Sequence, residues 1–198
     1  MQHNVHGLIL AGGQSSRMGS DKALLPVGGT ALLYRLASQL SELTDSVIIS
    51  VGSREREVLY REALGNLAEQ ISFVADRYPG CGPLSGLHAG LSAARNGYVF
   101  VIACDMPQLS GALFEQLTTH IESGADVIHY EGQPFHALYH SRTAPVIQMS
   151  LEEQDYRVMG LLRRLHTVEV EALDDGLSSM FTNLNTPDDY MKYVAEKK

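Results

Sequence analysis

The chain has 198 residues, of which 44% are hydrophobic, and 15 Lys and Arg against 23 Asp and Glu give a formal net charge of −8. A chain of this length buries roughly 70% of the surface that it exposes when unfolded, so its core needs no disulfide or structural metal. The acidic balance, without any basic block, argues against nucleic acid and anionic membranes as partners. It is still compatible with a local cationic pocket for a small anionic ligand.

The two cysteines, Cys81 and Cys104, lie far apart in the sequence, which fits neither a zinc site nor a redox pair. Unpaired thiols are typical of a reducing compartment, so we expect a cytoplasmic protein. The apolar run Leu8–Ala11 near the N-terminus is too short for a signal peptide, and no other stretch is long enough to span a membrane.

Short β-branched runs alternate with helical patterns through the first two-thirds of the chain. The runs are Gly7–Leu10, Val47–Val51, Ile71–Val74 and Val99–Ala103. Leucines at helical spacing after Thr30, the expected N-cap, predict the first helix, and further helices are expected at Arg54–Leu64, Leu84–Arg95 and Ala112–Glu122. This alternation predicts an α/β fold: a mainly parallel sheet with helices on both faces.

The last third predicts a hairpin from Val127–Tyr130 and His136–Tyr139 at the edge of the sheet. The patterns that follow predict helices near Thr143–Gln154 and Val158–Leu165, a strand at Val168–Val170, and a closing helix begun by Thr186 and Pro187. No linker or repeat interrupts the chain, so we expect one domain over residues 1–198. Ligands of open α/β sheets bind beyond the carboxyl ends of the strands, which directs attention to the loops there.

The loop after the first strand, Leu10–Lys22, carries apolar side chains only at its start and at Met18. Consecutive Gly12 and Gly13 allow backbone N–H groups to approach a ligand and form an anion-binding nest, to which Arg17 and Lys22 add cations. The loop fits neither a Walker loop nor the dinucleotide fingerprint. A flexible loop that ends in two solvated charges is the alternative interpretation.

This loop, followed by Ala23-Leu24-Leu25-Pro26, resembles the signature loop of the molybdenum cofactor guanylyltransferases. The resemblance extends to about Tyr190 and implies a three-layer, Rossmann-like nucleotidyltransferase fold. It implies that Leu10, Ala11, Gly12 and Gly13 line the base and phosphates of the nucleotide. It also implies that Lys22 contacts the triphosphate and that Arg17 is a second phosphate cation.

Asp105 follows the strand Val99–Ala103, in the sequence Cys104-Asp105-Met106-Pro107-Gln108-Leu109. Taken alone, an Asp at this place also suits a helix cap or a turn. The Asp-x-Pro-x-Leu pattern resembles the metal motif of the family, which implies that Asp105 binds Mg²⁺ and the nucleotide. The eight histidines show no metal-ligand spacing.

Asp76 begins the Gly- and Pro-rich loop Asp76–Gly86, and the family has an Asp here that contacts the guanine nucleotide. Its carboxylate can accept hydrogen bonds from N1–H and N2–H₂ of guanine, or it can bind the ribose; a turn-stabilising Asp is the alternative. Many relatives also carry an Asn at the end of the second strand, where this chain has Ser50-Val51-Gly52-Ser53. A backbone group or Ser53 is expected to substitute for it.

Asn183 and Asn185 resemble the family's Asn-x-Asn-Thr-Pro element, whose asparagines are linked to the pterin-bearing acceptor. Two positions apart on an extended segment, they would face the same side. The alternative is that they only precede a helix capped by Thr186. Because Lys22 and the asparagines come from opposite ends of the chain, we expect each to reach only its own substrate.

The resemblance implies transfer of GMP from GTP, with Mg²⁺ as cofactor, to the terminal phosphate of molybdopterin or its molybdenum-loaded form. Arg17, Lys22 and Asp105 would be the catalytic residues, residues 1–110 the nucleotide-binding half and residues 111–198 the acceptor-binding half. Transient contact with other molybdenum cofactor biosynthesis proteins or apo-molybdoenzymes is left open. The alternatives are a cytidylyltransferase acting on the same pterin, a sugar-phosphate nucleotidyltransferase, and a non-catalytic GTP-binding regulatory protein.

Overall fold

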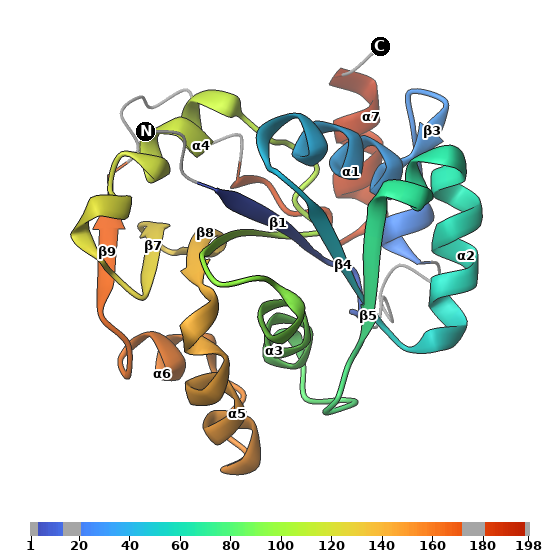
Figure 1. Ribbon diagram of the computed structural model, residues 1–198. Coiled ribbons are helices and arrows are strands. Elements are labelled where there is room, and N and C mark those ends of the chain that lie inside the picture. Colours follow the sequence, from blue (N-terminus) through green and yellow to red (C-terminus); the bar gives the residue numbers. More distant parts are fainter. Residues whose placement is uncertain (1–3, 14–20, 172–180, 197–198) are drawn as a thin grey trace.

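A computed structural model describes residues 4–13, 21–171 and 181–196, which contain a seven-stranded sheet in the order β5-β4-β1-β6-β8-β7-β9 (Figure 1). Neighbouring strands are parallel except where β8 pairs with β6 and with β7. The strands are β1 (Val5–Leu10), β4 (Val47–Gly52), β5 (Ile71–Ala75), β6 (Tyr98–Ala103), β7 (Val127–Tyr130), β8 (Gln133–His140) and β9 (Thr167–Val170). The predicted α/β class with a mainly parallel sheet is confirmed.

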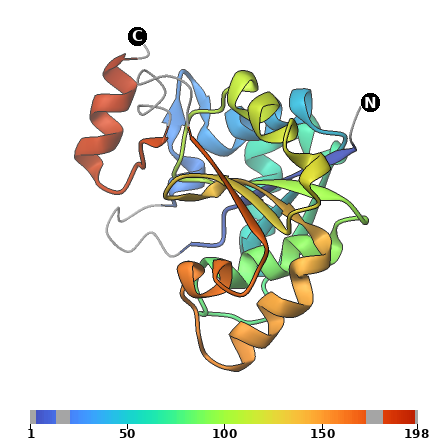
Figure 2. The same cartoon turned by 90° about the vertical axis from the view of Figure 1, so that its left-hand side faces the viewer.

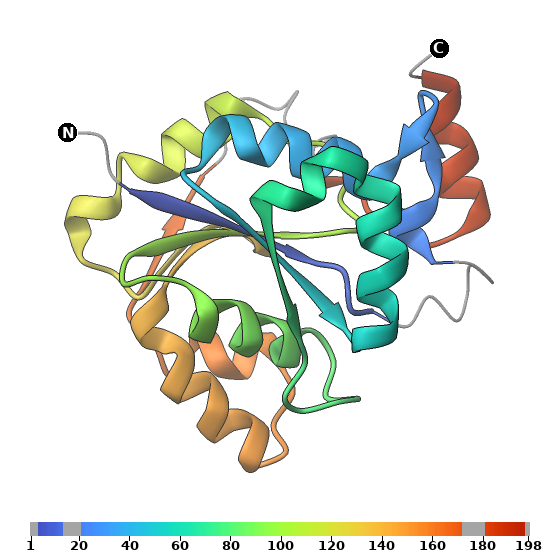
Figure 3. The ribbon, with the colours of Figure 1, turned by 45° about the vertical axis from the view of Figure 1, so that its right-hand side comes forward.

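Helices cover both faces of this sheet, each over its own apolar core (Figures 2 and 3). One core contains side chains of α1 (Leu32–Leu43), α2 (Arg54–Leu64), α4 (Gly111–Thr118) and α7 (Pro187–Glu196). The other contains side chains of α3 (Pro83–Ala93), α5 (Ala144–Glu152) and α6 (Val158–Leu162). The central strands contribute apolar side chains to both faces, as expected of a sheet that is covered on both sides. Within the described ranges, no helix has the length and apolar character needed to cross a membrane.

Helix α3 packs against the sheet through glycine. A Cβ atom added to Gly90 would lie 2.3 Å from Cδ2 of Leu8 on β1, and one added to Gly86 would lie 2.7 Å from Oγ of Ser50 on β4. Both separations are shorter than any real contact of a Cβ atom, so only glycine allows the helix to come this close. The close approach places the N-terminal turn of α3 directly beside the carboxyl ends of β1 and β4.

The structure corrects several boundaries predicted from the sequence. Thr30 is not the N-cap of α1: it pairs in a small hairpin of β2 (Pro26–Val27) and β3 (Thr30–Ala31), and Ala31 takes the cap position. The β7–β8 hairpin does not lie at the edge of the sheet, because β8 pairs with β6 and β7 pairs with β9. Helices α4 and α6 end earlier than predicted, at Thr118 and Leu162.

Candidate functional site

A cavity of about 720 Å³ opens at the carboxyl ends of β1, β4, β5 and β6. Every described residue that the sequence predicted to bind the nucleotide lines it: Leu10, Ala11, Gly12, Gly13, Lys22, Asp76 and Asp105. These residues come from three separate loops, which the parallel strands bring to one edge of the sheet. Arg17, the predicted second phosphate cation, lies outside the described residues.

The floor of the cavity is a crossing of two backbone segments at Gly12 and Gly52. A Cβ atom on Gly12 would lie 2.8 Å from Cα of Gly52, and one on Gly52 would lie 2.9 Å from Cα of Gly12. Gly52 also has a φ of 73°, in the left-handed region that favours glycine. Just before Gly12, the chain is hydrogen-bonded to both neighbouring strand ends. Ala11 N–H donates to the Ser50 carbonyl of β4 (2.9 Å), and Cys104 N–H, after β6, donates to the Leu10 carbonyl (3.0 Å).

Lys22 and Asp105 both line the cavity and form an ion pair, with Nζ of Lys22 3.5 Å from Oδ2 of Asp105. Nζ of Lys22 also donates a hydrogen bond of 2.9 Å to Oδ1 of Asn185. The segment that carries Asn185 is held to the loop after β6, because Leu184 N–H donates to the Asp105 carbonyl at 2.7 Å. Lys22 and Asn185, expected at separate substrates, are therefore in direct contact, and which substrate each one reaches stays a prediction.

Asn183, the other predicted acceptor residue, is exposed and does not line the cavity. It lies on the same segment as Asn185, between Phe181 and the start of α7. Leu184, between the two asparagines, is fully buried in the core beneath α1 and α4. The burial of Leu184 leaves its two neighbours on the outer side of the segment, as the alternation along an extended chain predicts.

Two residues of α2, which the sequence analysis did not single out, hold the glycine loop. The buried hydroxyl of Tyr60 lies 2.9 Å from the Ala11 carbonyl and 2.8 Å from Oδ2 of Asp21, so one side chain bridges the two ends of the loop. Burial and the nearby Asp21 carboxylate raise the pKa of Tyr60, which keeps the hydroxyl protonated. Arg56 donates from Nη1 to the Gly13 carbonyl at 2.9 Å and brings a second cation to the cavity wall.

Asp76 lines the cavity directly after the end of β5, and its side chain is half-buried. Ser50 Oγ donates to Asp76 Oδ1 at 3.0 Å. Burial raises the pKa of Asp76, while the hydroxyls of Ser50 and Ser85 and the charge of Arg56 oppose that rise. Ser53, the residue expected to replace the family Asn, also lines the cavity, but the hydrogen bond to Asp76 comes from Ser50.

The donor set at Asp105 fits a magnesium ion that keeps most of its water. Mg²⁺ bound to nucleotides takes one or two carboxylates and otherwise water and phosphate oxygens. Asp105 supplies one carboxylate, 30% exposed towards the cavity. Within the described ranges, no group of three or more His, Cys, Asp and Glu side chains could enclose a metal. Cys104, next to Asp105, is buried, and burial raises the pKa of its thiol, so it offers no thiolate ligand.

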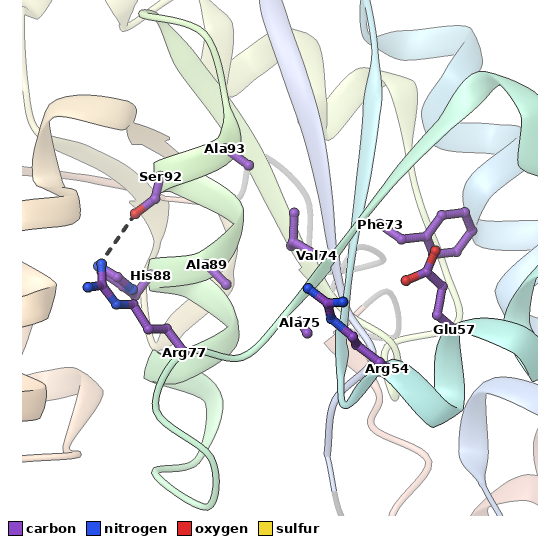
Figure 4. A pocket seen from close by; sticks show the side chains of 10 residues that line it. All are labelled: Arg54, Glu57, Phe73, Val74, Ala75, Arg77, His88, Ala89, Ser92 and Ala93. Carbon is purple, nitrogen blue, oxygen red and sulfur yellow. Dashed lines mark hydrogen bonds between the residues drawn. The ribbon is translucent and has the colours of Figure 1, made fainter.

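A second cavity, of about 480 Å³, lies beside β5 between α2 and α3 (Figure 4). Its rim carries Arg54 from the start of α2 and Arg77 from the loop after β5, and its wall includes the aromatic ring of Phe73. None of the predicted site residues lines it. The convergence of predicted residues therefore distinguishes the cavity at the strand ends from this one.

The parallel sheet, the glycine loop after β1 and the carboxylate after β6 are those of an α/β nucleotidyltransferase. A family model described as "MobA-like NTP transferase domain" matches residues 7–169, and the chain belongs to this family. A molybdenum cofactor guanylyltransferase of Vibrio atlanticus is 32% identical over 192 residues, which cover 94% of this chain and 93% of the relative. The protein is thus a nucleotidyltransferase.

Solved structures share the fold. The molybdopterin-guanine dinucleotide biosynthesis protein A of Archaeoglobus fulgidus superposes with a TM-score of 0.81 at 24% identity, covering 98% of this chain and 100% of that chain. A protein of Mycobacterium tuberculosis, solved in complex with manganese, superposes with a TM-score of 0.60 at 19% identity, covering 98% and 100%. At these identities the likeness concerns the fold alone.

Proposed function

We propose that this chain transfers GMP from GTP to the terminal phosphate of molybdopterin, with or without molybdenum, and releases pyrophosphate. The observation that best supports this proposal is the single cavity that gathers the glycine loop, Lys22, Asp76 and Asp105. Its size, about 720 Å³, suits a nucleotide-sized ligand. The choice of a guanylyl group and of the molybdenum cofactor as acceptor follows the name of the Vibrio relative, a molybdenum cofactor guanylyltransferase.

The reaction needs no general base from the protein. A phosphate monoester has a second pKa near 6, so the acceptor oxygen is already ionised at neutral pH. That oxygen forms a bond to the α-phosphorus of GTP while the bond from this phosphorus to the bridging oxygen breaks, and pyrophosphate leaves with the electron pair. The protein has to align two anions and neutralise their charge.

In this proposal, Lys22 and the amides of the glycine loop hold the phosphates, and Asp105 holds Mg²⁺. When bound, the ion would neutralise charge on the phosphate oxygens. Arg56, which already lies against the Gly13 carbonyl, adds positive charge to the same wall. Asn185 keeps the Lys22 ammonium in place through its 2.9 Å hydrogen bond. Asp76 accepts hydrogen bonds from the donor edge of guanine.

The same proposal assigns the nucleotide to residues 1–110 and the acceptor to residues 111–198, with Asn183 and Asn185 at the pterin. The substrates are GTP and molybdopterin, and the unpaired Cys81 and Cys104 are consistent with a cytoplasmic location. Partners that pass on or receive the cofactor would be proteins of molybdenum cofactor biosynthesis or apo-molybdoenzymes.

The test is pyrophosphate release from purified protein with Mg²⁺, molybdopterin and each of the four nucleoside triphosphates in turn. We expect GTP to be the preferred donor, since a bidentate pair with a base edge discriminates by roughly 1–3 kcal/mol. Equal or faster turnover of CTP would favour a cytidylyltransferase. Tight GTP binding without any pyrophosphate release would favour a regulatory GTP-binding protein.

A further inference from the structure

A buried serine of β4 supports the carboxylate that faces the cavity from β5. Ser50 is fully buried, and its hydroxyl donates to Oδ1 of Asp76 at 3.0 Å. The Ser50 hydroxyl also lies directly under helix α3. A Cβ atom added to Gly86 of this helix would lie 2.7 Å from Ser50 Oγ. Helix α3 thus packs directly over this hydroxyl, whose hydrogen bond goes to Asp76.

The groups around Asp76 are few and come from three elements. Ser50 approaches from β4, the fully buried Ser85 from α3, and the positive charge of Arg56 acts from α2. Ser85 Oγ forms no hydrogen bond of good geometry, so Ser50 supplies the well-formed one. Asp76 N–H is held in turn by the Gly52 carbonyl at 3.3 Å. Asp76 is therefore fixed by one hydrogen bond at its backbone N–H and by another at one carboxylate oxygen.

We propose that Ser50 is a positioning residue for guanine recognition: it fixes the Asp76 carboxylate so that this group meets N1–H and N2–H₂ together. The inference rests on the proposed function, because it takes guanine as the base. A serine hydroxyl has a single proton, and donating it to Oδ1 leaves Oδ2 and the remaining lone pairs of Oδ1 for the base. A carboxylate that is free to rotate would keep one of these hydrogen bonds more easily than both.

The inference separates two purine nucleotides. Guanine offers N1–H and the exocyclic amine, whereas the hypoxanthine of ITP offers N1–H alone. Loss of the Ser50 hydrogen bond should therefore weaken GTP binding more than ITP binding. The hydrogen bond also favours the ionised form of Asp76, so without it the pKa of this carboxyl should rise further. As the pH is lowered, the carboxylate should then become protonated earlier, and GTP affinity should fall at a higher pH than in the wild-type protein.

The experiment measures the dissociation constants of GTP and ITP, each with Mg²⁺, by calorimetric titration at several pH values. Ser50→Ala is compared with the wild-type protein and with Ser85→Ala, which removes an equally buried hydroxyl near Asp76 that lacks a well-formed hydrogen bond and should therefore change both readouts less. We expect Ser50→Ala to bind GTP about tenfold more weakly, as for loss of a hydrogen bond to a charged group. It should also have a smaller preference for GTP over ITP and a pH midpoint shifted upward.

The outcomes distinguish the inference from the function on which it rests. If the wild-type protein binds ITP and CTP as tightly as GTP, guanine recognition by Asp76 fails and the proposed function fails with it. If the wild-type protein discriminates but Ser50→Ala behaves like Ser85→Ala, only the role of Ser50 is refuted. Thermal unfolding checks each variant first; should Ser50→Ala not fold, Ser50→Cys, with similar volume and a weaker donor, serves the same comparison and should change both readouts in the same direction.

Discussion

His136 should make the protein acid-sensitive in a narrow and calculable way. The side chain is fully buried in β8, and neither ring nitrogen has a hydrogen-bond partner among the described residues. Its ring meets Phe100 and Phe181 nearly edge-on, each at a centroid distance of 5.4 Å. Because this apolar setting cannot solvate an imidazolium, burial lowers the pKa of His136 from 6.5 to about 4.

The sign and size of the effect follow from linkage. The unfolded state takes up the proton near pH 6.5 and the folded state only near pH 4, so the contribution to stability is complete above pH 6.5 and is lost as the pH falls towards 4. Each pKa unit corresponds to about 1.4 kcal/mol, so the shift from 6.5 to about 4 gives a loss of about 3.5 kcal/mol once both states are protonated. That is a large share of the 5–15 kcal/mol typical of a folded domain.

The measurement is the free energy of unfolding in urea at pH 7.5 and at pH 4.5 for the wild-type protein and for His136→Leu. The variant keeps an apolar side chain of similar volume and cannot titrate, so it should lose about 2 to 3 kcal/mol less than the wild-type protein over this interval. Identical losses in wild-type protein and His136→Leu would refute the assignment.

Asp105→Ala should reduce turnover by about 10²–10³-fold while thermal unfolding stays unchanged, because it removes the proposed metal ligand, whose side chain is 30% exposed to the cavity and not part of the apolar core. Lys22→Ala should raise KM for GTP, and Asn185→Ala should raise it by a smaller factor, because Asn185 orients Lys22. Steady-state kinetics with varied GTP would contradict this if Asn185→Ala had the larger effect. Asn183→Ala, which has no such contact with the cavity, should spare GTP binding and weaken molybdopterin binding, as titration with each substrate would reveal. Gly12→Ala should abolish GTP binding in calorimetry, since its Cβ would lie 2.8 Å from the backbone of β4, and unaltered affinity would contradict the crossing.

The strands and most helices of the first two-thirds could be predicted because their signals are local. Apolar β-branched runs predict buried strands, and helical spacing of leucines predicts α1. The convergence of the loops after β1, β5 and β6 then follows from a parallel sheet, whose strands all end at the same edge. The sheet topology thus indicated which loops to consider, whereas the individual nucleotide-site residues came from the family resemblance; the described ones line one cavity.

What escaped prediction depends on pairing between distant segments. The two-residue strands β2 and β3 carry too few residues for any periodicity, so the local pattern predicts Thr30 as a helix cap and not as part of a strand. Similarly, a hairpin pattern does not show which other strands will pair with it. In the structure β8 pairs with β6, so the hairpin lies inside the sheet and not at its edge. Tyr60 reaches the glycine loop across 49 positions of sequence, and nothing in the local pattern of α2 distinguishes it from an ordinary core tyrosine.

The contact between Lys22 and Asn185 changes how the two substrates must be related in space. The ammonium lies 3.5 Å from the Asp105 carboxylate and 2.9 Å from the Asn185 amide oxygen, so Lys22 contacts one residue from each half of the chain. An in-line displacement requires the acceptor oxygen and the leaving pyrophosphate to flank one phosphorus atom. Under the roles proposed above, with Asn185 at the acceptor and Lys22 at the triphosphate, their hydrogen bond would couple the positions of the two substrates. Lys22 and Asn185 are 163 positions apart in the sequence, and the fold brings them into contact at the cavity.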